Sequence, residues 1–197
     1  MNNVKKGILH VITGPMFSGK SEELVKRLRR YKIAKLQVQV FNHAIDIRYA
    51  VGKIASHSKQ KWNATGIVKP TELFKSIRPQ TDVVVIDEAQ FFHKNLVKVV
   101  RDLTKKGIEV IVAGLDTNFR GEPFGPMPDF LAIADGDVIK LKAVCAVCHK
   151  WNATRTQRLL KNARPAPYTD RLIKVGAADS YEARCRTHHY VPGKYKK

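Results

Sequence analysis

Eight consecutive residues near the N-terminus combine glycines, a lysine and a hydroxyl in a spacing suited to binding phosphate. They read Gly14-Pro15-Met16-Phe17-Ser18-Gly19-Lys20-Ser21 and match the pattern G-x-x-x-x-G-K-[ST] in full. In such a loop the glycines let the backbone point its N–H groups at a phosphate, at the N-terminus of the next helix. Lys20 would reach the β- and γ-phosphates of a nucleotide, and the Ser21 hydroxyl would ligate Mg²⁺. The alternative is a glycine-rich turn that matches by chance, and the flanking strand and helix patterns argue against it.

Two adjacent carboxylates, Asp87 and Glu88, directly follow an apolar, β-branched run. We expect Asp87 to serve the outer sphere of Mg²⁺, as acidic residues in this position do. Successive side chains of an extended chain point to opposite faces, so Glu88 would face a second substrate as a general base. The alternative is that the pair merely caps the strand in solvent. Phe91 and Phe92 are either core residues or one wall of a substrate pocket.

All three cysteines lie in the last third of the chain, in a spacing typical of a metal site. Cys145-x-x-Cys148 and Cys185-x-x-His188 offer four ligands in two pairs, which predicts a closed, structural Cys₃His zinc site. The long segment between the pairs predicts a loop extruded between the two arms of a zinc ribbon. His189 leaves the fourth ligand open, although the spacing favours His188. The alternative is three buried free cysteines.

The elements that must position these residues alternate between strand and helix patterns. Apolar, β-favouring runs predict strands at 8–13, 38–41, 82–86 and 108–114. Leu24, Leu28 and Tyr31 mark one face of a helix after the phosphate-binding loop, and a second helix ends at Gly107. This alternation predicts an α/β fold with a parallel sheet and right-handed crossovers.

Beyond residue 114 the pattern changes. Residues 119–129 are rich in proline and glycine and predict a loop, followed by a short helix and a strand at 138–143. A β-like segment covers 172–175. We expect three parts: a P-loop α/β domain at 1–140, a zinc-ribbon domain with a long loop at 141–192, and a flexible basic tail at 193–197.

Composition and net charge exclude some classes of protein and favour certain partners. The chain has 197 residues, 44% of them hydrophobic, with a net charge of +19, which excludes wholesale disorder and fibrous folds. Such a charge favours polyanionic partners: nucleic acid, acidic lipid or small phosphate-bearing molecules. No apolar run is as long as a signal-peptide core or a membrane span, so we expect a cytoplasmic protein.

These motifs, in this order, resemble the type II thymidine kinase family from Gly14 to His188. The matching segments are 14–21, 46–49 with 56–57, 87–92, 115–125, 176–181 and the Cys/His pairs. The resemblance implies transfer of the γ-phosphate of ATP to the 5′-hydroxyl of thymidine, with Mg²⁺, in pyrimidine deoxynucleotide salvage. It also implies a homo-oligomer, commonly a tetramer.

The family resemblance also assigns roles to individual residues. Glu88 is the proton acceptor for the 5′-hydroxyl. The ATP and Mg²⁺ site would contain residues 14–21, Asp46, Arg48, Asp87 and Gln90. The thymidine site would contain Phe119 and Tyr181 around base and sugar, Thr156 near the thymine methyl, and a lasso of Leu172, Ile173, Lys174, Val175 and Gly176 that holds the base through backbone groups.

Two other functions fit parts of the sequence. A nucleic-acid-dependent P-loop ATPase with a zinc ribbon would suit the positive charge, but the basic residues are dispersed along helix faces and form no arginine-rich run. A deoxynucleoside kinase of different base preference would have the same fold and differ only in the lasso residues. We therefore expect thymidine as partner and neither nucleic acid nor membrane.

Overall fold

The computed structural model describes residues 6–45, 53–55, 61–174 and 180–194. Its strands are β1 (Leu9–Thr13), β2 (Val38–His43), β3 (Lys53–Ala55), β4 (Lys61–Asn63), β5 (Thr65–Ile67), β6 (Val83–Asp87), β7 (Glu109–Gly114), β8 (Val138–Lys140), β9 (Arg155–Arg158) and β10 (Tyr181–Arg184). Its helices are α1 (Lys20–Ile33), α2 (Pro70–Ser76), α3 (Leu96–Lys105), α4 (Met127–Ile133) and the short 3₁₀ helix η1 (Ala89–Phe91).

Six strands form one parallel sheet in the order β5-β2-β6-β7-β1-β8. The central strands β6 and β7 are almost entirely buried, which explains their nearly continuous β-branched and apolar sequences. A separate antiparallel pair joins β3 to β4. The predicted α/β class and the parallel sheet are confirmed.

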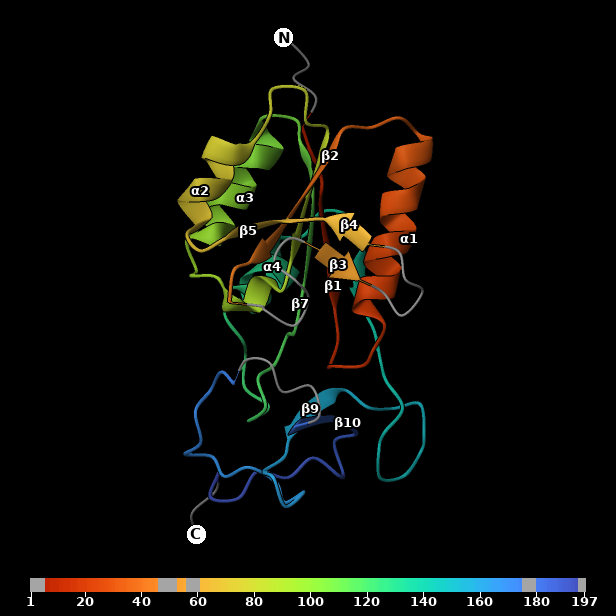
Figure 1. Ribbon diagram of the computed structural model, residues 1–197, viewed down its shortest axis with the longest axis vertical. Coiled ribbons are helices and arrows are strands. Elements are labelled where there is room, and N and C mark those ends of the chain that lie inside the picture. The colour runs from red at the N-terminus through yellow and green to blue at the C-terminus, as the bar shows by residue number, and fades with distance from the viewer. Residues whose placement is uncertain (1–5, 46–52, 56–60, 175–179, 195–197) are drawn as a thin grey trace.

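Helices cover both faces of this sheet (Figure 1). α1 packs on one face, where Leu24 and Leu28 join an apolar cluster with residues such as Ile12 and Val85. α2, α3 and α4 cover the other face, in a cluster that includes Leu73, Leu103 and Phe130. We call this part, residues 6–140, the sheet lobe.

The carboxyl ends of the parallel strands share one edge of the sheet, which faces the C-terminal part of the chain (Figure 1). The phosphate-binding loop follows β1, Glu88 follows β6, and the segment 115–126 follows β7. Open α/β sheets bind their ligands at this edge. The topology therefore brings three sequence-distant segments to the place where a substrate would bind.

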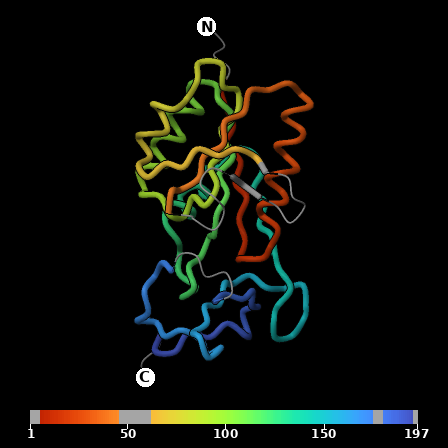
Figure 2. Tube along the Cα trace, in the orientation of Figure 1, coloured from red at the N-terminus to blue at the C-terminus, as the bar shows by residue number. Residues whose placement is uncertain are grey.

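The C-terminal part, residues 141–194, which we call the ribbon lobe, is built on the antiparallel pair β9–β10. A small cluster of alanines and cysteines packs beside it. Figure 2 shows the segment after β7 running down from the sheet to this lobe. Contacts between Phe119 and Ala166 and Val191 join the two.

Two predicted elements are wrong. Residues 172–174 form no strand, and residue 175 lies outside the described residues. The Arg171 carbonyl accepts a hydrogen bond from the Arg158 guanidinium, so a side chain rather than a strand partner holds this segment. The predicted loop 119–129 also ends early, because α4 begins at Met127, with a proline in its first turn, where proline is well tolerated.

Within the described residues, no helix is long and apolar enough to cross a membrane.

Candidate active site and metal centre

The phosphate-binding loop has the backbone geometry that its glycines predict. Gly14 and Gly19 have φ angles of 149° and 83°, which L side chains rarely adopt. A Cβ on Gly14 would lie 2.7 Å from both the Ser18 hydroxyl oxygen and the Leu141 carbonyl oxygen. Phe17 is also left-handed, with φ 64°, and strain of this kind in a non-glycine residue concentrates at functional sites.

Two polar side chains of this loop lie where a bound phosphate would contact them. The Ser18 hydroxyl is buried and has no hydrogen-bond partner among the described residues. Lys20 is the first residue of α1, and its amine donates to the Pro15 carbonyl at 2.8 Å, folded back over the loop. The positive end of the 14-residue helix α1 lies at the same place. Together these features form a cradle for a phosphate chain.

Glu88 lies just beyond β6, in a left-handed conformation with φ 52°. The expectation that it alternates faces with Asp87 in an extended chain is therefore wrong, because the strand ends at Asp87. Asp87 is buried, and its carboxylate accepts the Glu88 backbone N–H at 2.9 Å. This turn directs the Glu88 carboxylate toward Gln90.

Gln90 links Glu88 to the neighbouring strand. Its amide nitrogen donates to Glu88 Oε2 at 2.5 Å, and its oxygen accepts the Leu115 backbone N–H at 3.0 Å. The side chain is 2% exposed. Gly114 makes room for it, since a Cβ there would lie 2.5 Å from Gln90 Oε1. Gln90 thus fixes the position of the Glu88 carboxylate.

Of the two phenylalanines after Glu88, one belongs to the core. Phe92 is buried in the cluster under α2 and α3. Phe91 is half-buried and meets the ring of Phe124 edge-on, with centroids 5.8 Å apart. Phe124, which no role was predicted for, belongs to the segment that follows β7.

The ribbon lobe contacts the phosphate-binding loop through Thr156. Its hydroxyl accepts the Met16 backbone N–H at 3.0 Å, and the side chain is 2% exposed. Residues 140 positions apart in the chain are joined by this hydrogen bond. The described contact of Thr156 is therefore with the loop that would hold the phosphates.

Arg158 lies between the two aromatic residues predicted to surround the nucleoside. Its guanidinium carbon is 4.5 Å from the centroid of the Phe119 ring and 5.6 Å from that of Tyr181. The side chain is 1% exposed and donates to the Arg171 carbonyl; Asp170 lies 3.6 Å away. Its Nε and Nη2 are buried without a hydrogen-bond partner. Sequence reasoning missed Arg158, because nothing local marks a single arginine in a strand as a buried one.

The described part of the predicted lasso lies close to Tyr181. The Tyr181 hydroxyl donates to the Lys174 carbonyl at 3.4 Å, and Leu172, Ile173 and Lys174 are exposed. Four predicted site residues lie outside the described residues: Asp46, Arg48, Val175 and Gly176.

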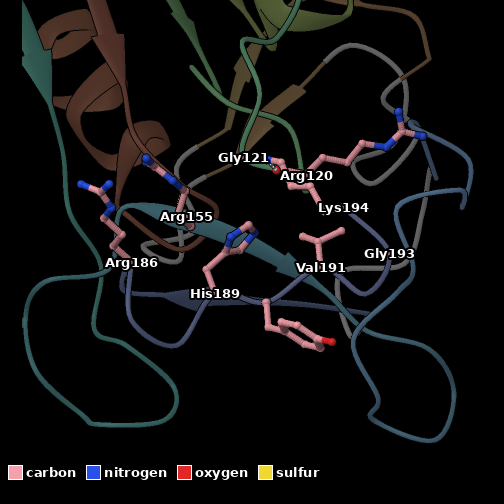
Figure 3. Close-up of a pocket in the computed structure, with 9 residues that line it drawn as sticks. Arg120, Gly121, Arg155, Arg186, His189, Val191, Gly193 and Lys194 are labelled. Atoms are coloured by element: carbon pink, nitrogen blue, oxygen red, sulfur yellow. Dashed lines mark hydrogen bonds between the residues drawn. The ribbon is translucent and has the colours of Figure 1, made fainter. Parts of the chain in front are cut away.

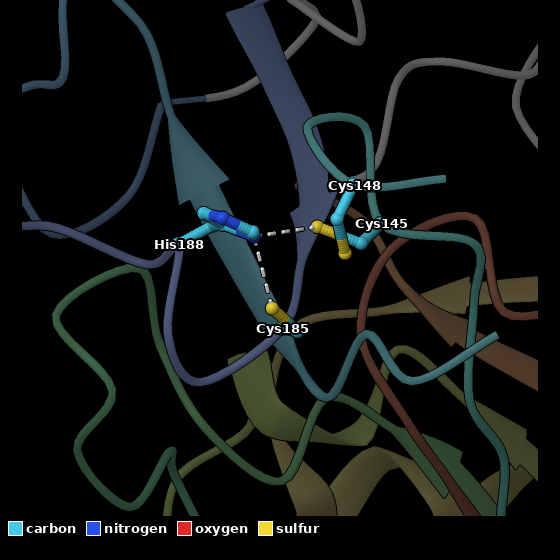
Figure 4. Close-up of side chains that lie close together, drawn as sticks. All are labelled: Cys145, Cys148, Cys185 and His188. Atoms are coloured by element: carbon cyan, nitrogen blue, oxygen red, sulfur yellow. Dashed lines mark hydrogen bonds between the residues drawn. The ribbon is translucent and has the colours of Figure 1, made fainter. Parts of the chain in front are cut away.

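The three cysteines and His188 converge on one point (Figure 4). Their ligand atoms all lie within 4.8 Å of one another. His188 Nδ1 is 3.2 Å from the Cys185 sulfur and 3.7 Å from the Cys145 sulfur. Three sulfurs and one imidazole at this spacing fit a tetrahedral zinc ion. The chain therefore carries a Cys₃His cluster that could hold one zinc.

The local environment of Cys145 favours the thiolate form that binds metal. Burial raises the pKa of the Cys145 thiol, but hydrogen bonds from backbone N–H groups, including those of Cys148 and Cys185, lower this pKa to about 5. The neighbouring histidine has a different role. His189 Nε2 donates to the Phe119 carbonyl at 2.9 Å, and burial lowers its pKa. Of the two candidates for fourth ligand, only His188 joins the cluster.

The fold and the site define a class: a P-loop phosphotransferase sheet with a Cys₃His ribbon at its ligand-binding edge. Comparisons with known proteins narrow this further. The family model for thymidine kinase matches residues 7–189. A curated thymidine kinase from Coprothermobacter proteolyticus is 53% identical over 188 residues, which cover 95% of this chain and 93% of that protein.

The chain belongs to the thymidine kinase family. Its function is that of a thymidine kinase, and it is therefore an enzyme that transfers a phosphoryl group from a nucleotide donor. The resemblance inferred from the sequence motifs is confirmed.

Proposed function

We propose that the protein transfers the γ-phosphate of ATP to the 5′-hydroxyl of thymidine, giving thymidine monophosphate and ADP. The observation that carries this is the placement of two groups at one edge of the sheet. The phosphate-binding loop directly follows β1, and Glu88, whose carboxylate is held by Gln90, directly follows β6. Phosphoryl transfer needs such positioning and electrostatic stabilisation more than it needs covalent chemistry.

The donor triphosphate would bind in the loop of residues 14–21. Backbone N–H groups and the Ser18 hydroxyl would donate to its oxygens, and the Lys20 amine would leave the Pro15 carbonyl for the β- and γ-phosphates. The Ser21 hydroxyl offers a hard oxygen ligand of the kind that Mg²⁺ prefers, and Asp87 would lie in the outer sphere of the ion. Neutralisation of charge on the transferred phosphoryl group is what Mg²⁺ supplies when bound. By resemblance, Asp46 and Arg48 would complete this site.

Glu88 would accept the proton of the 5′-hydroxyl. Its left-handed backbone and the hydrogen bond from Gln90 hold the carboxylate in one orientation, so little reorganisation is needed at the moment of transfer. Gln90 is then a positioning residue, because it is buried and bonded to Glu88 and Leu115. This differs from the direct nucleotide contact that the resemblance implied.

Thymidine would bind between the segment after β7 and the ribbon lobe. Phe119 and Tyr181 flank Arg158 there, and the resemblance adds Thr156 and the lasso residues 172–176. A planar base with few polar edge atoms suits aromatic walls and backbone hydrogen bonds. A zinc ion on the Cys₃His cluster would hold the two arms of the ribbon together and keep this wall in place.

The experiment is product analysis with Mg-ATP and a panel of nucleosides, comparing the wild type with Glu88→Gln. We expect thymidine monophosphate as the main product, with no stimulation by added DNA or RNA. Glu88→Gln should bind ATP and thymidine normally and turn over roughly 10²–10⁴-fold more slowly, the usual contribution of a positioned base. Glu182→Gln, which changes a carboxylate in the ribbon lobe, serves as the matched control. Full activity of the Glu88 variant would remove it from the mechanism.

Three expectations stay predictions: the homotetramer, the cytoplasmic location and the limits of the domains.

A further inference from the structure

A cavity of about 640 Å³, lined by the ribbon lobe and by residues 120–121 of the sheet lobe, has a charged lining that is entirely basic (Figure 3). Its basic residues are Arg120, Arg155, Arg186, His189 and Lys194. The other lining residues are glycines, a tyrosine and a valine, so no acidic side chain lines it. We call this cavity the basic pocket. Its volume falls within the roughly 300–1,000 Å³ of small-molecule sites.

Two arginines of the pocket, Arg155 and Arg186, lack an ion-pair partner among the described residues. Arg155 lies directly opposite Arg184 in the β9–β10 ladder, and like charges in that position repel each other. Arg184 pairs with Glu182 at 2.9 Å, whereas Arg155 and Arg186 have no carboxylate partner within 4 Å in the part of the chain that the structure describes. An anion bound between them would supply the missing charge.

An acidic residue near the other side of the pocket, Glu122, already has a hydrogen-bond partner. The hydrogen bond from Tyr168 and the charges of Lys194 and Arg120 lower the pKa of the Glu122 carboxyl. Its carboxylate accepts the Tyr168 hydroxyl at 2.7 Å, and Glu122 does not line the cavity. Arg120 donates one guanidinium nitrogen to the Asp170 carbonyl at 2.9 Å. Its Nε remains buried without an acceptor. The Arg120 guanidinium lies over the Tyr168 ring, with its carbon 4.5 Å from the ring centroid, and extends away from Arg155 and Arg186 (Figure 3).

The basic pocket is distinct from the phosphate-binding loop. Thr156 contacts Met16 of that loop, and Arg155, the preceding residue of β9, points to the other face of the ribbon because side chains alternate along a strand. Gly121 lines the pocket beside Arg155 and His189. A Cβ there would approach the His189 ring at 3.4 Å and Arg155 Nε at 3.8 Å, on a backbone with φ +73°.

We propose that the basic pocket binds a condensed phosphate: a linear chain of two or three phosphates, either free or as the tail of a nucleotide. Guanidinium forks match phosphate oxygens in pairs, which favours phosphate over a simple halide. The spread of basic groups around a cavity of this size favours a chain over a single orthophosphate. This second site does not depend on the catalytic roles proposed above.

The experiment is calorimetric titration of the zinc-loaded, full-length protein with inorganic triphosphate, in a Lys20→Ala background that weakens the phosphate-binding loop. We expect one equivalent to bind at 0.15 M salt, and orthophosphate to bind more weakly. Adding Arg155→Ala with Arg186→Ala should lower the affinity at least tenfold. The matched control is Lys161→Ala with Arg164→Ala, which removes the same charge from exposed positions of the same lobe outside the pocket; it should change the affinity less than twofold.

Zinc content and melting temperature establish that the pocket variants are folded. If the double variant loses zinc, Arg186→Ala alone, at an exposed position, replaces it, with an expected loss of about threefold or more. Titration with ATP in the same background separates the sources: equal affinity supports recognition of a nucleotide tail, and weaker affinity supports a free condensed phosphate. Loss of all binding with Lys20→Ala, or equal effects of the pocket and control pairs, would overturn the proposal.

Discussion

The sheet lobe buries apolar side chains on both faces of its strands, whereas the core beside the Cys₃His cluster consists of Ala143, Ala153, Ala183 and two of the cysteines. Burial of a full Leu, Ile or Phe side chain contributes about 1.5–3 kcal/mol, and the sheet lobe has many of these. Alanines contribute much less. The ribbon lobe must therefore draw its stability from elsewhere, and a metal ion is the source that its ligands suggest.

The two lobes also differ in how they hold polar groups. In the sheet lobe the strands satisfy one another along the ladder, as the parallel register of β6 and β7 illustrates. In the ribbon lobe, side chains satisfy several backbone groups. Arg158 donates to the Arg171 carbonyl, and the Gln157 amide donates to the Tyr190 carbonyl and accepts the Tyr190 N–H. A lobe built in this way can carry specific contacts to a neighbour without a large core. The stability of the ribbon lobe therefore depends more on each single hydrogen bond than the stability of the sheet lobe does.

Removal of the metal should produce the largest difference in stability between the two lobes. Apparent binding free energies for structural zinc are on the order of 10–16 kcal/mol, so chelation, or Cys185→Ser, should unfold the ribbon lobe and leave the sheet lobe folded. Hydrogen exchange measured segment by segment would show lost protection at 143–185 and retained protection in β6 and β7. Thr187→Ala, an exposed change in the same turn, should leave protection intact. A protein with no zinc, or one whose protection survives chelation everywhere, would contradict the comparison.

A core truncation in the sheet lobe is the converse change. Leu28 of α1 is completely buried, so Leu28→Ala should lower the free energy of unfolding by about 2–5 kcal/mol. Ile33, at the end of the same helix, is 81% exposed, and Ile33→Ala should stay within about 0.5 kcal/mol of the wild type. Urea unfolding of both variants measures this, and zinc content should be unchanged in each. An equal effect at the two positions would mean that α1 is not packed as described.

The smallest expected effect concerns the contact that joins the lobes. Thr156→Val removes the acceptor of the Met16 N–H and should cost about 0.5–1.5 kcal/mol, the net value of one hydrogen bond. Because Met16 belongs to the phosphate-binding loop, affinity for ADP should fall several-fold. Thr156→Ser keeps the hydroxyl and should restore affinity, as direct titration of both variants would reveal. Wild-type affinity in Thr156→Val would show that the ribbon lobe does not support the loop.

Much of the fold was predictable because its signals are local. Short stretches of sequence predict a structure in three places: the β-branched run before Asp87, the glycines at 14 and 19, and the two Cys/His pairs. The alternation of strand and helix patterns then predicts a parallel sheet, and chirality predicts right-handed crossovers. The errors were local too: the extended conformation expected at Glu88 and the strand expected at 172–175 both assumed that a β-like sequence continues where tertiary contacts turn it.

The sequence alone determined the phosphate-binding loop, the parallel sheet and the three cysteines of the candidate zinc site, because backbone sterics and ligand spacing act over short stretches of chain. The structure decided that His188 rather than His189 joins these cysteines. The tertiary structure alone decided that Gln90 holds Glu88, that Arg158 lies between Phe119 and Tyr181, and that basic residues from separate segments surround one cavity. Gln90 and Glu88 are only two residues apart, but the Gln90 oxygen is bonded to Leu115 after the neighbouring strand, and the other contacts join positions far apart along the chain. No local pattern therefore encodes them. The contact of Arg158 with Phe119 and the basic pocket need both lobes, whereas Gln90 holds Glu88 within the sheet lobe alone.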